Sequence, residues 1–506
     1  MSGSERLALL APQAESDRAQ PPGSQTAGSA AHNQAIASGV MWQGALRWIS
    51  QVLAWTATIV IARRLSPADY GIAGSAGVFV GLLSLVTDGG LARALVMRRE
   101  RDDSAVRQVH GAAIATGVVL ALVMLLAALP LAAYYAEPRL APVVMVLSSV
   151  LVLSGLNAIP LAVMQQQLQY RLLAAIDFGK AIAQGLTVLI CALLGLRYWS
   201  LAIGLIAGHL VALLWTRRYV RLAPRRPVRA AIGPTLQYAQ HLVVSALAWY
   251  LYSNADFAIV GGVAGLAALG YYQFAWNVAQ LPGEKLANVL QAVVLPFFGS
   301  IGEDRAALRH YFLILSELLV SVMLPILFGF ALVSPIAVPL IFGAKWAASI
   351  PVMQVLVICA AINSVSMLSQ HVLGATGQAV VTARLNLAAL VILPTGFFIA
   401  ARQSGPLAVA CVWLLAQPML VGVPLLKLRS SIDLSVRQYL RNLRAPFFCS
   451  LGMAAAVLGV RTRLHGVAPI VQLFVLCTLG AVVYLASFFL IFRARVNAIV
   501  SVWRDR

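Results

Sequence analysis

Long apolar runs, separated by short polar or basic loops, follow one another along the chain from about residue 36 onward. Each run can cross a hydrocarbon core of about 30 Å as a helix. The runs are too long for barrel strands, and in lipid the backbone must satisfy its own hydrogen bonds, so we expect helices. The pattern predicts an all-α polytopic membrane protein with about fourteen transmembrane helices, at 37–62, 71–96, 109–134, 141–163, 173–195, 199–217, 236–261, 270–299, 309–333, 350–373, 379–401, 407–427, 445–461 and 467–492.

The first helical hairpin has a weak echo about 200 residues later. Val60 and Gly71 are 11 residues apart, as are Ile259 and Gly270, and a tyrosine stands beside each glycine. Each glycine is expected to open a helix after a tight turn. The repetition suggests two similar six-helix lobes, a plan that is common in transporters and places the substrate site between the halves.

Charge and composition divide the chain further. The predicted parts are a disordered cytoplasmic tail at 1–35, an N-terminal lobe at 36–217, a basic cytoplasmic linker at 218–235, a C-terminal lobe at 236–429, and an additional helix pair with a cytoplasmic tail at 430–506. The Pro-rich region 334–349 reads as a connection that could re-enter the membrane, and 445–461 as the shortest span.

Two of the predicted spans carry continuous polar stripes at helical spacing. The stripe on span seven consists of Gln237, His241, Ser245, Trp249, Tyr252 and Asp256. The stripe on span eight consists of Gln273, Asn277, Gln280, Glu284, Asn288 and Gln291. The equivalent spans of the first half carry Gln43, Arg47, Ser50 or Gln51, and Thr58 on span one, and Ser84, Thr87, Asp88 and Arg93 on span two.

Such stripes are costly against lipid, because one charged side chain at mid-membrane costs about 2.5–3.5 kcal/mol on insertion scales. Either the polar residues hold helices together through hydrogen bonds, or they line a water-filled chamber. Because the stripes are continuous and occupy paired spans, we favour a chamber between spans one, two, seven and eight. The expected lining is Arg47, Gln51, Asp88, Arg93, Trp249, Tyr252, Asp256, Gln273, Asn277, Gln280, Glu284, Lys285 and Asn288.

Individual residues allow narrower hypotheses. Arg47 has no obvious local partner and is the strongest candidate for contact with an anionic group. Trp249 and Tyr252 are candidates for stacking on sugar faces, with ordinary helix packing as the alternative. Asp177 and Lys180 are three residues apart and are expected to neutralise each other.

Pro282 and Gly283 stand together midway along span eight. A proline removes one backbone hydrogen bond and clashes with the preceding turn, so we expect a kink here. The kink is a candidate hinge for alternating access or a fixed bend, and the sequence does not separate the two.

The distribution of basic residues predicts how the helices are oriented in the membrane. The chain is 60% hydrophobic but only 11% charged, with a net charge of +20. With the N-terminus inside, the inner segments carry 25 Lys and Arg residues and the outer loops 8, so both termini are expected in the cytoplasm. Because the basic residues cluster in these loops, the net charge reflects membrane orientation and we expect no nucleic-acid partner.

The sequence carries no sign of an enzyme. There is no Walker A motif, no GxSxG motif and no His/Cys metal constellation. The five cysteines lie within apolar spans and read as small core residues. Arg63 and Arg64 read as a solvated turn. No cofactor or metal is predicted, and whether transport is coupled to protons or to sodium is left open.

Two stretches carry a family resemblance. ARRLSPADYG and FVGLLSLVTDGGLARALVMRR in the first half, and NADFAIVGGVAGLAALGYYQFAWNVAQLP in the second, resemble polysaccharide repeat-unit exporters. These are the Wzx-type flippases of the multidrug/oligosaccharidyl-lipid/polysaccharide (MOP) superfamily, and the likeness to the colanic-acid and succinoglycan exporter branch covers about residues 36–430.

The resemblance implies a fold of twelve core helices, here with an extra pair, and alternating access in the bacterial inner membrane. It implies an undecaprenyl-pyrophosphate-linked oligosaccharide as substrate, for exopolysaccharide or lipopolysaccharide biosynthesis, with a polysaccharide polymerase, chain-length proteins and membrane lipid as partners. By position Arg47 matches a pyrophosphate-binding role, Arg93 and Lys285 less surely, and Asp256 matches an acidic position of the seventh helix.

Two other classes stay open. A multidrug cation antiporter of the same superfamily would favour an acidic, aromatic cavity, and the four helices hold three residues of each sign, so charge does not decide. A polysaccharide polymerase would be expected to show a large outer loop, and a polyprenyl-dependent glycosyltransferase acidic motifs in an inner loop. The sequence shows neither feature.

Overall fold

The computed structural model describes residues 55–98, 102–301, 304–376, 378–464 and 466–504, all of which fall in one compact unit that begins at Ala54. The first half contains α2 (Pro67–Val86), the short η2 (Thr87–Leu91), α3 (Ala92–Arg98), α4 (Asp103–Tyr134), α5 (Leu140–Gln166), α6 (Tyr170–Leu193) and α7 (Trp199–Tyr219). The second contains α8 (Arg229–Ala264), α9 (Leu266–Ile301), α10 (Arg305–Phe342), η3 (Ala344–Ser349), α11 (Ile350–Ser366), α12 (Ser369–Ala375), α13 (Ala379–Ile432), α14 (Val436–Arg461) and α15 (Pro469–Arg504).

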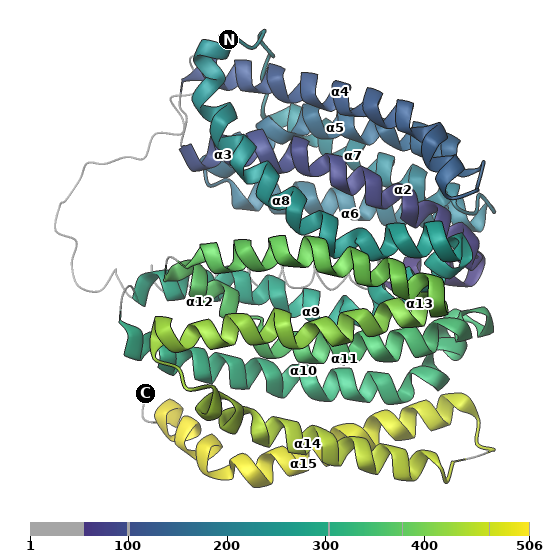
Figure 1. Ribbon diagram of the computed structural model, residues 1–506, viewed down its shortest axis with the longest axis vertical. Coiled ribbons are helices and arrows are strands. Elements are labelled where there is room, and N and C mark those ends of the chain that lie inside the picture. The colour runs from purple at the N-terminus through teal and green to yellow at the C-terminus, as the bar shows by residue number, and fades with distance from the viewer. Residues whose placement is uncertain (1–54, 99–101, 302–303, 377, 465, 505–506) are drawn as a thin grey trace, which may run out of the picture. The chain divides into compact units, whose positions relative to one another are not determined.

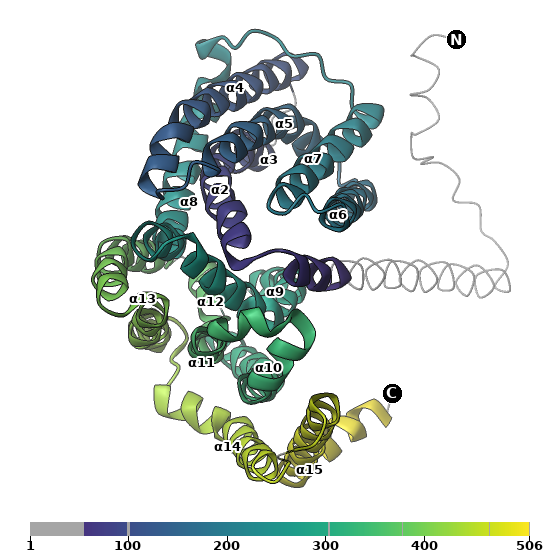
Figure 2. The ribbon, with the colours of Figure 1, turned by 90° about the vertical axis from the view of Figure 1, so that its right-hand side faces the viewer.

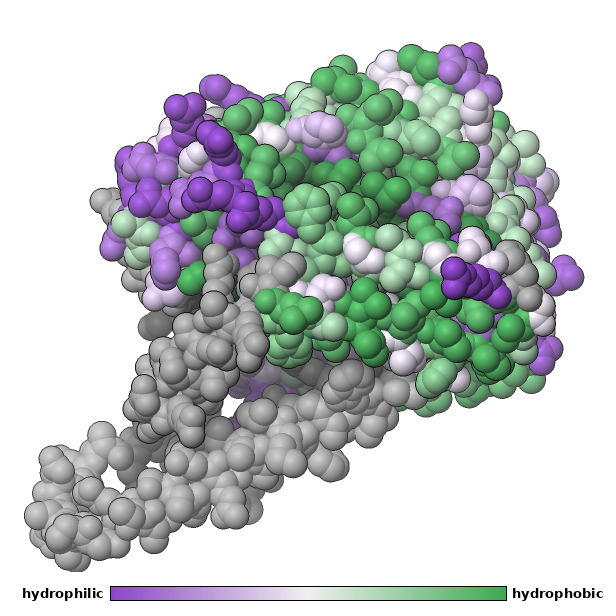
Figure 3. Space-filling model, turned by 90° about the horizontal axis from the view of Figure 1, so that it is seen from below, coloured by the Kyte–Doolittle hydropathy of each residue, from purple (hydrophilic) through white to green (hydrophobic). Residues whose placement is uncertain are grey.

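Helices account for nearly all of the described chain, which contains no strand. Among the described residues, eleven helices are long and apolar enough to cross a membrane. One of them, α13, contains two predicted spans, because Ser404 and Gly405 break the helical backbone between them. Figure 3 shows the broad apolar surface that these helices present, with hydrophilic residues gathered near its edges. The all-α, multi-pass prediction is therefore confirmed.

The predicted connection at 334–349 is wrong, because α10 continues to Phe342 and only a short 3₁₀ turn, η3, follows. Pro335 has no N–H for the carbonyl of Ala331. That carbonyl accepts a hydrogen bond from Gln354 Nε2 at 3.0 Å and from Ser334 Oγ at 2.9 Å instead. Substitute donors of this kind let a membrane helix run through proline. The predicted span 445–461 is present as α14, but the helix begins nine residues earlier, at Val436.

The helices of the second half follow the predicted order, and α14 and α15 form a separate pair beside α10 (Figures 1 and 2). Helix α8 begins at Arg229, within the expected linker 218–235, and packs mainly against α13. The linker is pinned to α4: the N–H of Arg225 donates to the carbonyl of Arg107, and that of Val228 to Gln108 Oε1, both at 3.0 Å. The start of the second half is thereby anchored on the first.

Two glycines account for the echo in the sequence. A Cβ on Gly71 would overlap the carbonyl oxygen of Leu266, and one on Gly270 would overlap that of Pro67. In each case the glycine of one helix, α2 or α9, faces the first residue of the other. The helices begin at Pro67 and Leu266, so the prediction that the glycines open them is wrong by one turn. Their role is to bring the two backbones into contact.

Basic side chains from each half cap a helix of the other beside this crossing. Arg63 Nε and Nη2 donate to the carbonyls of Ile341 and Leu340, both at 2.7 Å, at the end of α10. Lys345 Nζ donates to the carbonyls of Arg63 and Leu65, at 2.9 and 2.6 Å. A cation at a helix C-terminus satisfies free carbonyls and favours the helix dipole. Arg63 is exposed, as the sequence predicted, but it lies in a helix rather than a turn and its guanidinium caps α10.

An aromatic cluster fills the space between these caps. Trp346 is fully buried and donates from Nε1 to the carbonyl of Ala62 at 2.8 Å. Its ring stacks on Phe274, with centroids 4.2 Å apart, and meets Tyr70 and Tyr271 edge to face. We call the glycine crossing, the two basic caps and this cluster the turn-end junction. The opposite end of the helices, with the arginine-rich loops, is the basic end.

Substituting Gly71 or Gly270 with alanine should destabilise the protein by about 1–3 kcal/mol, because the new methyl group meets a backbone carbonyl that cannot move independently. Gly77, also on α2, has no atom within 4 Å of an added Cβ and is the matched control. Heat-induced unfolding in detergent, followed by size-exclusion chromatography, measures the difference. Equal melting for the Gly71 and Gly77 variants would contradict the close crossing.

Replacing Arg63 by glutamine should lower stability by about 1–2 kcal/mol, the usual value of a charged hydrogen bond discounted for solvent exposure. Arg64 is adjacent and exposed, and in the described part of the chain its guanidinium makes no comparable bond. Arg64→Gln should therefore melt as the wild type does. The same melting assay serves both variants. If Arg63→Gln lowered the melting temperature no more than Arg64→Gln, the cap formed by Arg63 would not stabilise the protein.

Candidate functional site

The predicted chamber residues divide into several groups. Arg47 and Gln51 lie outside the described residues, as do the side chains of Glu284, Lys285 and Asn288. The remaining predicted residues belong to α8, α9, η2 and α3, and they occupy three separate places in the structure. The backbone of α9 stays helical through Pro282 and Gly283. Their roles as hinge residues stay predictions.

The first group lies between α2 and α9 near the turn-end junction. Asn277 Nδ2 donates to the hydroxyl of Tyr70 at 3.0 Å. The amide of Gln273 lies where a side chain on Gly74 would stand. Asn277 thus joins the halves by a hydrogen bond, which corresponds to the alternative that polar residues hold helices together, whereas Gln273 only packs against α2.

The second group lies in the first half, in a cavity of about 530 Å³ that we call the charged recess. Asp88 and Arg93, which were predicted to line a chamber between the two halves, line this recess inside the first half instead. The structure adds Asp177 and Lys180 from α6 and His209 from α7. Asp88 belongs to η2, a single wide π-helical turn, a feature often found at functional sites.

The charged recess contains polar groups whose usual partners are absent among the described residues. Neither ion pair found among the described residues involves Lys180, so its expected pairing with Asp177 is not made at contact distance. Ser154 Oγ donates to Asp88 Oδ2 at 3.2 Å, and the Oδ1 atom of Asn157, which also lines the recess, is buried without a hydrogen-bond partner. Ser154, Asn157 and His209 were not predicted, although Ser154 and Asn157 are three residues apart on α5, a spacing that places them on one helix face.

The third group lies within the second half, in a cavity of about 210 Å³ that we call the aromatic recess. Trp249, Tyr252 and Gln280, which were predicted to line a chamber between the halves, line this recess inside the second half. Its other polar and aromatic lining residues, Ser253, Trp276, Asn363, Gln370, Asn386, Trp413 and Gln417, were not predicted. They come from α8, α9, α11, α12 and α13, so the recess lies inside one lobe and is walled by five helices.

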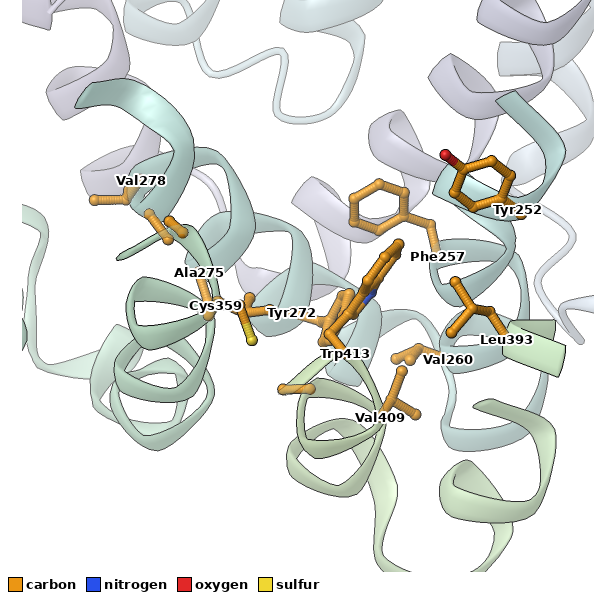
Figure 4. Close-up of a cluster of buried hydrophobic side chains, with 14 of the residues drawn as sticks. Tyr252, Phe257, Val260, Tyr272, Ala275, Val278, Cys359, Leu393, Val409 and Trp413 are labelled. Carbon is orange, nitrogen blue, oxygen red and sulfur yellow. The ribbon is translucent and has the colours of Figure 1, made fainter. Parts of the chain in front are cut away.

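Asp256 lies beneath the aromatic recess and is not one of its lining residues. It is fully buried, and its carboxylate accepts hydrogen bonds from Tyr272 Oη at 2.7 Å, Trp413 Nε1 at 2.8 Å and the N–H of Phe257 at 2.9 Å. Figure 4 shows Trp413 beside Tyr272, with Tyr252 further along α8. A buried carboxylate needs such donors, and here they also fix the plane of the Trp413 ring.

The arrangement offers two kinds of recognition. The charged recess presents carboxylates and cations that can hold or move a charged species. The aromatic recess presents ring faces and carboxamides, which suit an uncharged polar ligand. Since each recess lies in a different half, a ligand reaching both would bridge the two halves.

Comparison with known proteins gives this chemistry a context. The chain is 26% identical over 424 residues to the lipopolysaccharide biosynthesis protein WzxC of Escherichia coli (strain K12), covering 82% of this chain and 85% of that protein. It is 25% identical over 453 residues to the succinoglycan biosynthesis transport protein ExoT of Rhizobium meliloti (strain 1021), covering 88% and 91%. These relatives support the prediction of a transporter rather than a membrane enzyme.

Solved structures show the same fold. The lipid II flippase MurJ, in an inward closed conformation, matches with a TM-score of 0.73 and 15% identity over 90% of this chain and all of that one. An inward-facing multidrug resistance MATE transporter of the MOP superfamily matches with a TM-score of 0.57 and 13% identity, over 76% and 96%. At this identity the likeness concerns the fold alone.

A family model described as "polysaccharide biosynthesis protein" matches residues 60–351, more than half of the chain. This stretch contains the turn-end junction, the whole charged recess and the α8–α9 wall of the aromatic recess. The protein is therefore a member of this polysaccharide biosynthesis family, with the fold of the MOP transporters.

Proposed function

We propose that the protein flips lipid-linked oligosaccharide precursors of a surface polysaccharide across the bacterial inner membrane. The proposal is supported by the family membership, by relatives named for lipopolysaccharide and succinoglycan synthesis, and by polar recesses inside a bundle of apolar helices. The observation that carries it is the aromatic recess, because ring faces and carboxamides inside a membrane bundle are the chemistry that sugars require.

The orientation follows from the loops. The basic end carries the arginine-rich segments around 98–108, 218–228 and 427–444, and basic loops stay in the cytoplasm. We therefore propose that both termini are cytoplasmic and that the turn-end junction faces the periplasm. In this conformation the junction joins the halves on the periplasmic side, so substrate enters from the cytoplasmic side.

Alternating access then requires that the junction break while the basic end closes. The lipid carrier is proposed to be undecaprenyl pyrophosphate, with Arg47, Arg93 and Lys285 as candidate contacts for its phosphates. A polysaccharide polymerase and chain-length proteins are the expected partners for the flipped repeat units. Membrane lipid contacts the apolar surface throughout.

Deleting the gene should cause lipid-linked repeat units to accumulate in the inner leaflet and should abolish surface polysaccharide. Extraction of polyprenyl-linked sugars, together with staining of the cell surface, measures both effects. Complementation with the intact gene is the control. Normal polysaccharide combined with a change in drug sensitivity alone would favour the multidrug antiporter instead.

We further propose that transport is coupled to a cation gradient through the charged recess. Asp88 and Asp177 share one cavity with Lys180, and no ion pair satisfies that lysine in the described part of the chain. Because carboxylates and a lysine lie together in this cavity, a change in their spacing as the halves move can change which of them carry a proton. Sodium would occupy the same carboxylates.

Replacing Asp88 by asparagine should make flipping in proteoliposomes independent of an imposed proton or sodium gradient, whereas the wild type should speed up at least several-fold. Asp103→Asn is the control, because Asp103 lies at the surface in an ion pair with Arg107 at 2.9 Å. A wild type that ignores both gradients, or an Asp88 variant that keeps the response, would remove the coupling proposal.

A further inference from the structure

The aromatic recess is built from side chains that sequence position alone does not bring together. Trp249 and Tyr252 come from α8, Trp276 from α9, Asn363 from α11, and Gln417 from α13. At about 210 Å³ it is smaller than the roughly 300–1,000 Å³ of pockets for drug-sized ligands. A space of this size accepts one small ring rather than a whole oligosaccharide or an isoprenoid chain.

The chemistry of its described lining favours an uncharged ligand. Among the described residues that form the recess, none is Asp, Glu, Lys or Arg. The nearby carboxylate of Asp256 already accepts three hydrogen bonds, so it is not left to bind a cation. A phosphate group or a uronic acid would lose its hydration here without gaining a counter-ion.

The lining of the aromatic recess combines aromatic ring faces with carboxamides. A pyranose has C–H groups on its faces, which pack on aromatic rings, and hydroxyls at its rim, which both donate and accept hydrogen bonds. Carboxamides match such hydroxyls because they too carry a donor and an acceptor. Trp276 and Trp413 stand with ring centroids 5.5 Å apart and tilted by 47°, so they form a corner rather than a closed stack.

One lining atom lacks a partner. Gln417 is only 7% exposed, and its Oε1 atom is buried without a hydrogen bond. Most buried polar atoms in proteins are satisfied, so this oxygen at the wall of the recess can accept a hydrogen bond from a ligand hydroxyl or from a water molecule. By contrast, Asn386 Oδ1 already accepts from Tyr252 Oη at 3.2 Å, which holds the Tyr252 ring at the wall.

We propose that the aromatic recess is a subsite for one uncharged sugar ring of the transported oligosaccharide, with Gln417 accepting a hydrogen bond from a ring hydroxyl. This inference rests on the proposed flippase function and deepens it, because it places sugar recognition in the second half alone. Asp256 acts as a positioning residue through the indole N–H of Trp413. The charged recess and the lipid phosphates have no part in this contact.

The test uses the full-length protein in phospholipid nanodiscs, free of maltoside and glucoside detergents, which are themselves sugars. The probes are the methyl glycosides of glucose, galactose and mannose, with glucuronate as the charged comparison. Saturation-transfer difference NMR should detect at least one neutral glycoside and weaker or no signal from glucuronate. No signal from any neutral probe, or a preference for glucuronate, would overturn the proposal.

Three variants then localise the contact. Gln417→Leu and Asn363→Leu should each weaken binding of the neutral glycoside at least fivefold, since both remove a carboxamide that can form a hydrogen bond with a sugar hydroxyl. Gln403→Leu, at an exposed glutamine of α13 outside the recess, should stay within twofold of the wild type. Asn363 is exposed, so its substitution leaves the fold intact even if Gln417→Leu unfolds.

Export in the deletion strain separates the two proposals. If the wild-type gene restores surface polysaccharide but the Gln417 and Asn363 variants bind and export as it does, the subsite is wrong and the flippase function stands. If the wild-type gene restores nothing, the proposed function itself fails. Loss of both binding and export in the two variants, at normal membrane levels, supports the subsite.

Discussion

The exchange of basic caps between the two halves is the constraint on which the rest of the structure depends. Helix C-termini leave carbonyls without partners, and those groups need donors wherever water is scarce. Here Arg63 satisfies the end of α10, while Lys345 satisfies the end of the helix that precedes α2. Because each half supplies what the other lacks, neither helix end is fully satisfied unless the halves meet. The contact therefore defines a state of the transporter.

Much of the fold follows from the sequence because membrane helices obey a simple rule of length and polarity. The span boundaries failed where proline was read as a break. At Pro335 the local pattern indicated a connection, but a glutamine 19 residues further on supplies the missing donor. The prediction for Arg63 was also incomplete, because its hydrogen-bond partners are remote in the sequence. Nothing near it in the chain indicates that its partners lie 277 and 278 residues away.

The polar stripes indicate helix faces and leave open what lies opposite each face. Along α9, Gln273 and Asn277 meet α2, whereas Gln280 lies further along the helix and faces the aromatic recess. Neighbouring helices diverge, so a single stripe crosses two environments. Trp413 and Gln417 could not be singled out, because a lone tryptophan or glutamine in an apolar span is ordinary. The packing of α13 against α8 places both residues at the aromatic recess.

The glycine crossing of α2 and α9 also has a mechanical consequence. It lies close to one end of α9, about 46 Å from the far end of that helix at a rise of 1.5 Å per residue. The crossing can therefore serve as the fulcrum of a long lever. A rotation of about 10° there would displace the far end by about 8 Å, enough to admit a sugar ring. Such a rotation widens the bundle at the basic end with the junction intact, whereas the opposite, outward-open state requires the junction to break.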